Sequence, residues 1–284
     1  MKKTIVVTGG AGFIGSNLCE KLIELEHQVI SIDNYSFGLK ENHIPEVEYL
    51  DGETKDITQL LANKKVDLIF HLGEYSRVEQ SFTDVKEVLD SNTVGTQAVL
   101  EYVRHNGCKL VYAGSSTKFA EGGNGRDQSP YAWTKAVNTD LVRNYGTWYD
   151  IPYAITYFYN AYGPRERGDT ATGTLIKIFH DRYAKGLPLQ VRKPGNQRRN
   201  FTHVADIVDG LILVGEKGEG DDYGLGHPTS YSVEEVAKMF GTKIEELPER
   251  PGNRTGSPVD TKRTNLELVW TPKYDLPDYI KSIL

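Results

Sequence analysis

Three side chains have the types and spacing needed for acid–base chemistry on a hydroxyl group. Ser115 lies in the run Gly-Ser-Ser-Thr, and Tyr131 and Lys135 follow in the segment Ser-Pro-Tyr-Ala-Trp-Thr-Lys. Positions i and i+4 share one helix face, so the phenol and the ammonium lie together if this segment is helical. A phenol has a pKa of about 10, and a neighbouring ammonium stabilises its ionised form. Tyr131 could then act as a base, with Ser115 holding or relaying a substrate proton.

A glycine-rich segment near the start of the chain predicts a dinucleotide-binding turn. Gly9, Gly12 and Gly15 recur at intervals of three between a β-branched run and a helical pattern. The backbone must turn tightly there and approach a pyrophosphate, which sits on the N–H groups of the helix start. Asp33 ends the second β-branched run, where a carboxylate binds ribose hydroxyls and repels a 2′-phosphate. The pattern therefore predicts NAD as the cofactor, in preference to NADP.

These residues need alternating strands and helices to position them. Short, mostly apolar runs predict strands at Thr4–Thr8, Gln28–Asp33, Val66–Leu72, Lys109–Gly114 and Tyr153–Tyr159. Segments of helical spacing separate them, so we expect an α/β fold of the Rossmann type, with a doubly wound parallel sheet. Ser115 then lies at the carboxyl end of a strand, where such sheets bind ligands. This context favours a catalytic interpretation of a Tyr-x-x-x-Lys pair that, taken alone, is more typical of a solvated helix face.

The alternation loosens after Gly163, where glycine, proline and basic residues become frequent. We expect an NAD-binding domain at residues 1–163 and a smaller, loop-rich substrate domain mainly at 164–284, with strands that can cross back. A capping-box pattern, Ser232-Val-Glu-Glu, predicts a late helix. The basic residues of the second domain suit a diphosphate, which arginine binds with two parallel hydrogen bonds. The basic residues are Arg165, Arg167, Lys193, Arg198, Arg199, Arg250 and Arg254, of which Arg167 and Arg198 are expected to be solvated surface charges.

Composition excludes several other classes of protein. A formal net charge of −6 over 284 residues argues against nucleic-acid binding. No stretch approaches the ~18–20 apolar residues of a membrane span. Two cysteines form no disulfide framework, so we expect a cytoplasmic protein, and none of the motifs indicates a metal site.

Taken together, the motifs resemble the extended short-chain dehydrogenase/reductases that act on nucleotide sugars, and most closely their UDP-glucose 4-epimerase-like members. The resemblance runs in order over nearly the full chain, from the glycine-rich turn to Arg250-Pro-Gly-Asn253. It implies that Ser115, Tyr131 and Lys135 are the catalytic residues. It also implies a homodimer formed through helices at about 84–104 and 129–149.

The resemblance assigns further residues to the cofactor and the substrate. It implies contacts with NAD for Gly9, Gly12, Phe13, Ile14, Gly15, Asp33, Asn34, Asp56, Ile57, Leu72, Gly73, Glu74, Asn92, Tyr131, Lys135 and Phe158. Within this set, Asp56 and Ile57 are expected at the adenine, and Asn92 belongs to a segment that braces the loop beside the nicotinamide. It implies contacts with a nucleotide-diphosphate sugar for Ser115, Ser116, Asn160, Thr174, Arg199 and Arg250.

Departures from the family pattern bear on the reaction. Glu74 stands where relatives usually carry a small residue, and the segment 120–128 is a shortened, glycine-rich loop. Nucleotide-sugar 4,6-dehydratases carry an Asp-Glu pair directly after the hydroxyl residue, but this chain has Ser116 and Thr117. We therefore expect NAD-dependent epimerisation of a nucleotide-activated hexose at C4, through a transient 4-keto sugar. Two alternatives stay open: a dehydratase or net oxidoreductase of the same fold, and a non-catalytic dinucleotide-binding protein.

Overall fold

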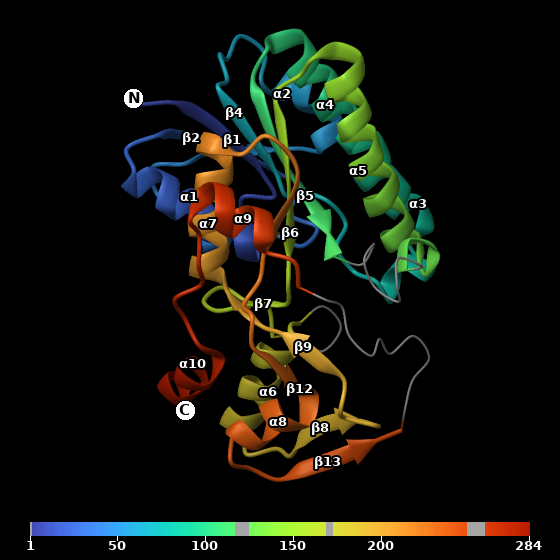
Figure 1. The fold of residues 1–284 in the computed structure, drawn as a ribbon, viewed down its shortest axis with the longest axis vertical. Coiled ribbons are helices and arrows are strands. Elements are labelled where there is room, and N and C mark those ends of the chain that lie inside the picture. The colour runs from blue at the N-terminus through green and yellow to red at the C-terminus, as the bar shows by residue number, and fades with distance from the viewer. Residues whose placement is uncertain (1, 117–124, 169–172, 249–258) are drawn as a thin grey trace.

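The computed structural model describes residues 2–116, 125–168, 173–248 and 259–284. Its largest element is a seven-stranded parallel sheet in the order β11-β6-β5-β4-β1-β2-β3 (Figure 1). The strands are β1 (Thr4–Thr8), β2 (Gln28–Asp33), β3 (Glu48–Asp51), β4 (Leu68–His71), β5 (Lys109–Ser115), β6 (Tyr153–Phe158) and β11 (Gly220–Leu225). The strand order reverses between β1 and β4, which is the doubly wound arrangement that the alternating pattern predicted.

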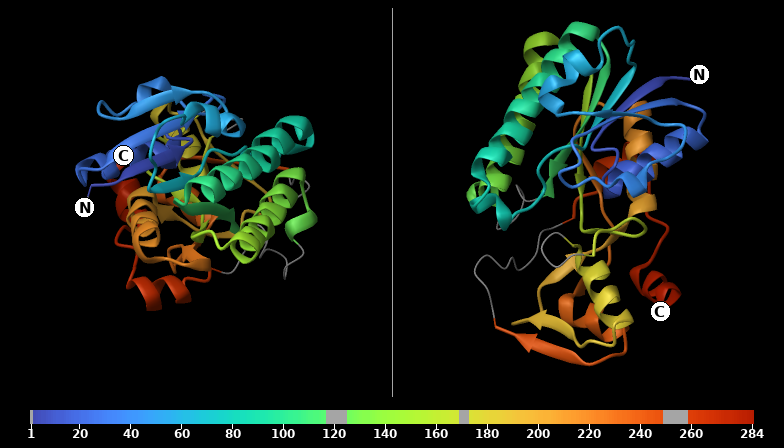
Figure 2. Two further views of the ribbon diagram at one scale, coloured as in Figure 1. Left: turned by 90° about the horizontal axis from the view of Figure 1, so that it is seen from above. Right: turned by 180° about the vertical axis from the view of Figure 1, so that it is seen from behind.

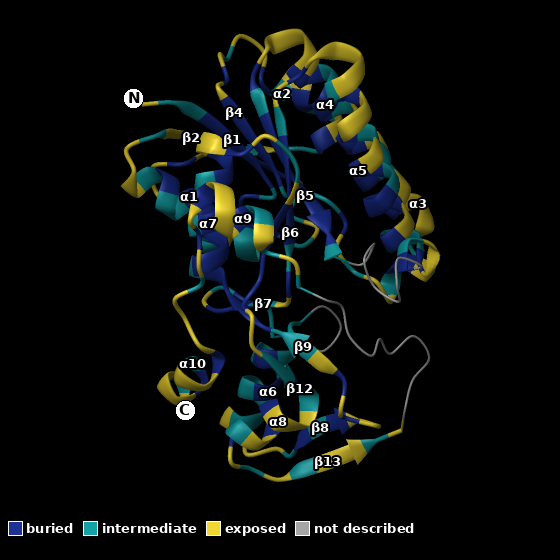
Figure 3. Ribbon diagram, in the orientation of Figure 1, coloured by how far each residue is buried: buried dark blue, intermediate teal, exposed yellow. Residues whose placement is uncertain are grey.

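Helices cover both faces of the sheet. The helices on one face are α1 (Phe13–Glu24), α7 (Val204–Lys217) and α9 (Lys262–Leu268), and those on the other are α2 (Ile57–Leu60), α4 (Gly95–Asn106) and α5 (Pro130–Tyr149). Seen from above, the two helical layers lie on opposite sides of the sheet (Figure 2). The five inner strands, β1, β2, β4, β5 and β6, are buried along most of their length, as their mostly apolar sequences predicted (Figure 3). The outer strands β3 and β11 are more exposed.

The predicted strands are observed, with two of them matching to the residue. Thr4–Thr8 and Gln28–Asp33 form β1 and β2, and the other three predicted ranges overlap β4, β5 and β6. Two sheet strands, β3 and β11, were not predicted. Residues Gly220–Leu225 of β11 carry two glycines and two aspartates, and their register shifts between Gly220 and Tyr223. Their strand conformation follows from pairing with β6 and not from local propensity.

A smaller group of elements lies beside the carboxyl end of the sheet. It contains three two-stranded pairs, β7 (Ala161–Tyr162) with β10 (Thr202–His203), β8 (Leu189–Arg192) with β13 (Ile244–Leu247), and β9 (Arg198–Asn200) with β12 (Ser230–Ser232). Its helices are α6 (Leu175–Ala184), α8 (Val233–Met239) and α10 (Leu276–Ile283). The predicted capping box starts α8, since the Ser232 hydroxyl accepts from Glu235 N at 3.0 Å and the Glu235 carboxylate accepts from Ser232 N at 2.6 Å.

The hydrophobic cores suggest a different division of the chain from a single cut after residue 163. Val204, Leu211 and Tyr223 belong to the core of the large sheet, whereas Phe179, Phe240 and Ile280 belong to a separate core of the smaller group. We therefore propose a discontinuous second domain, from which α7, β11 and α9 return to the first.

Short helical turns connect the remaining elements. They are η1 (Lys40–Asn42), η2 (Thr54–Asp56), η3 (Gln80–Phe82), α3 (Val85–Val88) and the π-helical turn η4 (Leu89–Val94). Among the described residues, no helix combines the length and apolar character needed to cross a bilayer.

Candidate active site

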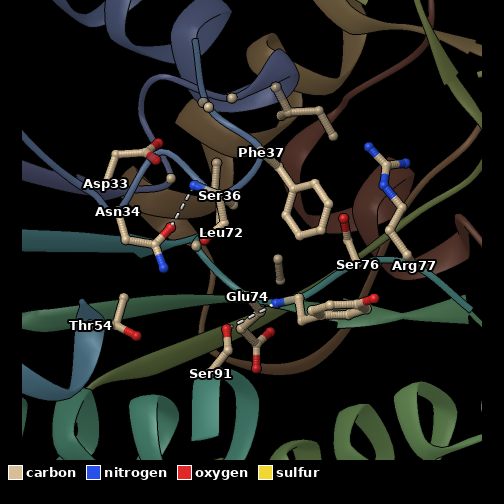
Figure 4. Close-up of a pocket in the computed structure, with 18 of the residues that line it drawn as sticks. Asp33, Asn34, Ser36, Phe37, Thr54, Leu72, Glu74, Ser76, Arg77 and Ser91 are labelled. Carbon is tan, nitrogen blue, oxygen red and sulfur yellow. Dashed lines mark hydrogen bonds between the residues drawn. The ribbon is translucent and has the colours of Figure 1, made fainter. Parts of the chain in front are cut away.

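A cavity of about 440 Å³ lies along the carboxyl ends of the sheet strands. In Figure 4, Asp33 and Asn34 lie toward one end of it and Ser76 and Arg77 toward the other. Its size is within the range of cofactor and ligand sites, and its place is the one where open α/β sheets bind ligands. Fourteen predicted site residues line it: Gly9, Gly12, Phe13, Ile14, Gly15, Asp33, Asn34, Leu72, Gly73, Glu74, Tyr131, Lys135, Phe158 and Thr174.

The glycine-rich turn is packed so closely that Gly9 and Gly15 have no room for a side chain. Gly9 has φ +73°, and a Cβ on Gly15 would lie 2.1 Å from the Gly9 carbonyl oxygen. Helix α1 begins after Gly12, which as a glycine has no side chain that could cap it. The first N–H groups of a helix without a side-chain cap are suited to an anion, and the helix dipole adds to that preference.

Asp33 supports the turn as well as lining the cavity. One carboxylate oxygen accepts from Ala11 N at 2.9 Å, and the other accepts from Tyr35 N at 2.8 Å. Burial raises the pKa of Asp33 above its usual range, although the two backbone N–H groups oppose that effect. Since each oxygen has a second lone pair, the carboxylate can still accept from ribose hydroxyls.

The three predicted catalytic side chains come together at the end of β5 and the first turns of α5. Proline at the first position and Ser129 as the N-cap, whose hydroxyl accepts from Ala132 N, begin α5 just before Tyr131. The Tyr131 hydroxyl donates to Ser115 Oγ at 3.3 Å. Lys135 lies one turn later and is buried, with Tyr131 and Lys135 both on the cavity wall.

The side chain of Glu74 lies beside these catalytic residues, in contact with Lys135. This contact could not be predicted from the spacing of the two residues in the sequence. The Glu74 carboxylate pairs with the Lys135 ammonium and also accepts from Thr96, Tyr112 and Asn138. The carboxylate therefore lies within a buried polar cluster and is not directed into open solvent.

Three residues assigned to NAD lie off the cavity wall. Asn92 is fully buried in η4, where its side chain bonds the backbone N and O of Tyr75 at 2.6 and 3.1 Å. It thus holds the loop after β4, as expected for a bracing segment. Asp56 and Ile57 follow Thr54, which does line the cavity, while Ile57 belongs to the core. Their contact with adenine remains a prediction.

The residues assigned to the substrate are spread over both groups of elements. Ser116 follows Ser115, and Thr174 precedes α6 and lines the cavity. Asn160 donates to the Asn200 carbonyl oxygen at 3.0 Å, and Arg199 lies on β9 beyond the cavity. Arg250 and residues 120–124 of the predicted short loop lie outside the described residues.

Arg198 and Arg167, both expected to be surface charges, differ in their surroundings. Arg198 is exposed and bonds Ser230 and Glu235, as expected for a surface charge. The same expectation for Arg167 is wrong, because Arg167 lines the cavity and donates to the Phe37 carbonyl oxygen at 3.1 Å.

Several wall residues were missed by the sequence analysis. Ser36 and Phe37 follow β2, and Ser76 and Arg77 follow β4, with the Arg77 guanidinium 5.4 Å from the Phe37 ring centroid. Their signal was available, since all four stand just after predicted strands, where ligands bind. Thr54 follows β3 and could not be found because that strand was not predicted.

Comparison with known proteins agrees with this geometry. A sequence model described as the NAD dependent epimerase/dehydratase family matches residues 5–226. A putative UDP-glucose 4-epimerase of Methanocaldococcus jannaschii is 31% identical, over 99% of this chain and 97% of the relative. UDP-glucuronic acid decarboxylase 3 of Arabidopsis thaliana is 30% identical, over 96% of this chain and 85% of the relative.

A solved structure is similar over the whole length as well. The UDP-glucose 4-epimerase of Thermotoga maritima, crystallised with UDP-glucose, superposes with a TM-score of 0.93 at 25% identity, covering 98% of this chain and 96% of that one. The family match covers the glycine-rich turn, Asp33 and the Ser-Tyr-Lys set. The chain belongs to the NAD dependent epimerase/dehydratase family, and its cofactor is NAD.

Proposed function

We propose that this chain is an epimerase that inverts C4 of a nucleotide-activated hexose, with Ser115, Tyr131 and Lys135 as its catalytic residues. The observation that carries the proposal is the hydrogen bond from the Tyr131 hydroxyl to Ser115 Oγ. Tyr131 and the buried Lys135 line the same cavity as the glycine-rich turn. Relatives named as UDP-glucose 4-epimerases support it.

Each catalytic side chain has one task in this proposal. When bound, NAD supplies a reversible two-electron oxidant for a carbon that bears a hydroxyl group. Tyr131, as the phenolate, removes the proton of the C4 hydroxyl, and Ser115 bridges the two oxygens. The Lys135 ammonium, one helical turn from Tyr131, stabilises the phenolate electrostatically, and its pairing with Glu74 moderates that effect. Tyr131 returns the proton after the sugar has presented its other face.

The remaining assignments divide the site between cofactor and substrate. The glycine-rich turn would hold the pyrophosphate of NAD, Asp33 and Asn34 its ribose, and Leu72, Gly73 and Phe158 its nicotinamide end. Ser116, Asn160, Thr174, Arg199 and Arg250 would hold the nucleotide-diphosphate sugar.

The residues after Ser115 favour epimerisation over dehydration. Water loss at C6 needs an acid for the leaving hydroxyl and a base for the C5 proton. Ser116 and Thr117 can serve as neither at neutral pH, because a hydroxyl group is neither acidic nor basic enough. Glu74 does not replace them, since its carboxylate is held by Lys135 and three further donors.

Decarboxylation of a nucleotide-activated hexuronic acid is the second candidate. Five of the similar curated proteins are named as decarboxylases of UDP-glucuronic or UDP-N-acetylglucosaminuronic acid. Oxidation of C4 in such a sugar creates a β-keto acid, which loses carbon dioxide readily. The same Ser115, Tyr131 and Lys135 chemistry would serve both reactions.

An NMR time course separates these functions. The purified chain is incubated with NAD and, separately, UDP-glucose, UDP-galactose and UDP-glucuronic acid. We expect glucose and galactose forms to interconvert, with no 6-deoxy signal and no accumulating NADH. A pentose product from the uronic acid would replace the proposal by the decarboxylase, and a 4-keto-6-deoxy product would replace it by a dehydratase.

We further propose a cytoplasmic homodimer. The described thiols of Cys19 and Cys108 are free and buried, which is compatible with a reducing compartment. Exposed apolar side chains on α3, η4 and α5 support pairing through this helical layer: Val85, Leu89, Val94, Trp133, Trp148 and Tyr149.

A further inference from the structure

Glu74 places a carboxylate against Lys135 at the buried side of the cavity. The Glu74 side chain is 3% exposed and that of Lys135 is 6% exposed. The Lys135 ammonium donates to Glu74 Oε2 and to the carbonyl oxygen of Ala113. An ammonium has three donors, so among the described residues one donor remains on a side chain that also lines the cavity.

The Glu74 carboxylate is held as an anion. Its Oε1 accepts from Thr96 Oγ1 at 2.9 Å, Asn138 Nδ2 at 3.0 Å and Tyr112 OH at 3.1 Å. Burial raises the pKa of Glu74, but the Lys135 ammonium and the hydrogen-bond donors outweigh burial and hold that pKa below its usual range. Glu74 and the Lys135 ammonium therefore form a buried pair without net charge.

A chain of buried hydrogen bonds from Thr8 through His71 and Thr96 holds the Glu74 carboxylate in place. Thr8 Oγ1 accepts from two backbone N–H groups of the loop after β4 and lies 2.8 Å from His71 Nδ1. The other ring nitrogen of His71 lies 3.1 Å from Thr96 Oγ1, which donates to Glu74. Burial lowers the pKa of His71 to about 4, so the ring is neutral at neutral pH. Turning the carboxylate away would break several buried hydrogen bonds, each costly to leave unmade.

We propose that Glu74 sets the balance between oxidised and reduced cofactor by cancelling the charge of Lys135. The inference depends on the proposed function in one respect: if Tyr131 and Lys135 act on the sugar carbon that exchanges hydride with NAD, Lys135 lies near the nicotinamide ring. The oxidised ring is positively charged and the reduced ring is neutral, so an unpaired buried ammonium disfavours the oxidised form alone. The carboxylate removes that bias. An enzyme that ends each cycle with the cofactor oxidised benefits from such a neutral pair.

The ratio of two dissociation constants tests the inference without any turnover. NAD and NADH are each titrated into the purified 284-residue chain after bound nucleotide has been removed, with binding followed by calorimetry. Contacts common to both forms cancel in the ratio Kd(NAD)/Kd(NADH). We expect Glu74→Gln to raise this ratio at least tenfold, because one unit charge acting over ~12 Å at an effective dielectric of ~20 already gives a tenfold effect.

Two further variants complete a cycle. Lys135→Met leaves the carboxylate unpaired and should lower the ratio Kd(NAD)/Kd(NADH). The double variant Glu74→Gln/Lys135→Met carries neither charge, so its ratio should lie within about threefold of that of the parent chain. If Glu74→Gln does not fold, Lys135→Met and the double variant still give different predictions, a lowered ratio and a ratio near that of the parent chain. Glu87→Gln is the matched control, because Glu87 lines the same cavity but is exposed, so solvent screens its charge.

Two outcomes of these titrations would overturn the inference about Glu74. A ratio in Glu74→Gln within about twofold of the parent chain would overturn the inference. A shift in the same direction for Glu74→Gln and Lys135→Met would assign the effect to repacking and overturn it too. Since the titrations need no substrate, a chain that fails to epimerise but follows the cycle would retain this inference and lose only the proposed function.

Discussion

At the scale of single residues, the chemistry of this site depends on which polar groups are already paired. Asp33 uses both carboxylate oxygens to hold the backbone of Ala11 and Tyr35, so a residue assigned to the cofactor also shapes the turn that binds it. Tyr131, by contrast, has Ser115 as its partner and faces the cavity. Substitutions of the two should therefore separate binding from turnover.

Replacing Tyr131 by Phe removes the proposed base and leaves the aromatic ring in place. We expect turnover to fall by about 10²–10⁴-fold, the usual contribution of acid–base catalysis, while the Kd for NAD changes little. Initial rates with the nucleotide sugar and calorimetric titration with NAD measure the two effects. Near-normal turnover in Tyr131→Phe would discard the assignment.

Replacing Asp33 by Asn removes the charge that discriminates against a 2′-phosphate. The amide has one acceptor oxygen, so it can hold Ala11 N or Tyr35 N but not both in the same way. We expect NAD to bind about tenfold more weakly and the preference over NADP to shrink, as measured by competitive titration. Glu53→Gln is a suitable comparison, because Glu53 lines the cavity and accepts from neither backbone group. Unchanged discrimination in Asp33→Asn would assign cofactor choice to other residues.

At the scale of elements, the start of α6 is joined to the strand β7 by a buried carboxylate. Glu166 accepts from Gly163 N at 2.6 Å and from the hydroxyl of Thr174, the residue before α6. Burial raises the pKa of Glu166 to about 7. The folded state therefore binds a proton more tightly than the unfolded chain between about pH 4.5 and pH 7.

The raised pKa of Glu166 predicts how the free energy of unfolding changes with pH. The contribution of Glu166 to the free energy of unfolding is greatest below about pH 4.5 and is lost as the pH rises through about 7. Between pH 5 and pH 8, the parent chain should lose up to about 3 kcal/mol more stability than Glu166→Gln, which has no such titration. Urea unfolding of both chains at the two pH values measures the difference, and the contributions of other titrating groups cancel in it. Parallel losses in the two chains would show that Glu166 is not protonated on folding.

At the scale of the whole molecule, two groups of elements enclose the candidate site. Helix α1 and the segment after β7 are joined by Arg165, which donates to both carboxylate oxygens of Glu20 at 2.9 and 2.7 Å. Asn17 bonds the carbonyl oxygen of Pro164 at 3.1 Å in the same region. These contacts lie next to the cavity that Arg167 and Thr174 complete from the second group.

The proposed dimer predicts the effect of one charge on the outer helical layer. Leu89 is exposed on η4, and Leu89→Arg would place a guanidinium between apolar faces that the proposed pairing buries. We expect the variant to be a monomer by light scattering at concentrations where the parent chain is a dimer. Leu266→Arg, on α9 and far more exposed, serves as control and should stay dimeric. A monomeric parent chain, or loss of the dimer in Leu266→Arg alone, would contradict this interface.

Much of the fold follows from local pattern. Apolar runs predict β1 and β2 to the residue, and Pro130 with Ser129 marks the start of α5. The parallel sheet with helices on both faces follows from the alternation of strands and helices, because parallel neighbours need crossover helices. β11 is different, since its glycines and aspartates have little strand propensity and pairing with β6 imposes its conformation.

The candidate site divides in the same way. Spacing alone brings Tyr131 and Lys135 to one helix face and sets the three glycines of the turn, because both patterns act within a few residues. Only the tertiary structure pairs Glu74 with Lys135, which lies 61 residues further along the chain. It also moves Arg167 from an expected surface charge to the cavity wall. Such contacts depend on which strand ends meet at one edge of the sheet. They also depend on burial, which strengthens the interaction between charged groups. Neither can be determined from the spacing of residues along the chain.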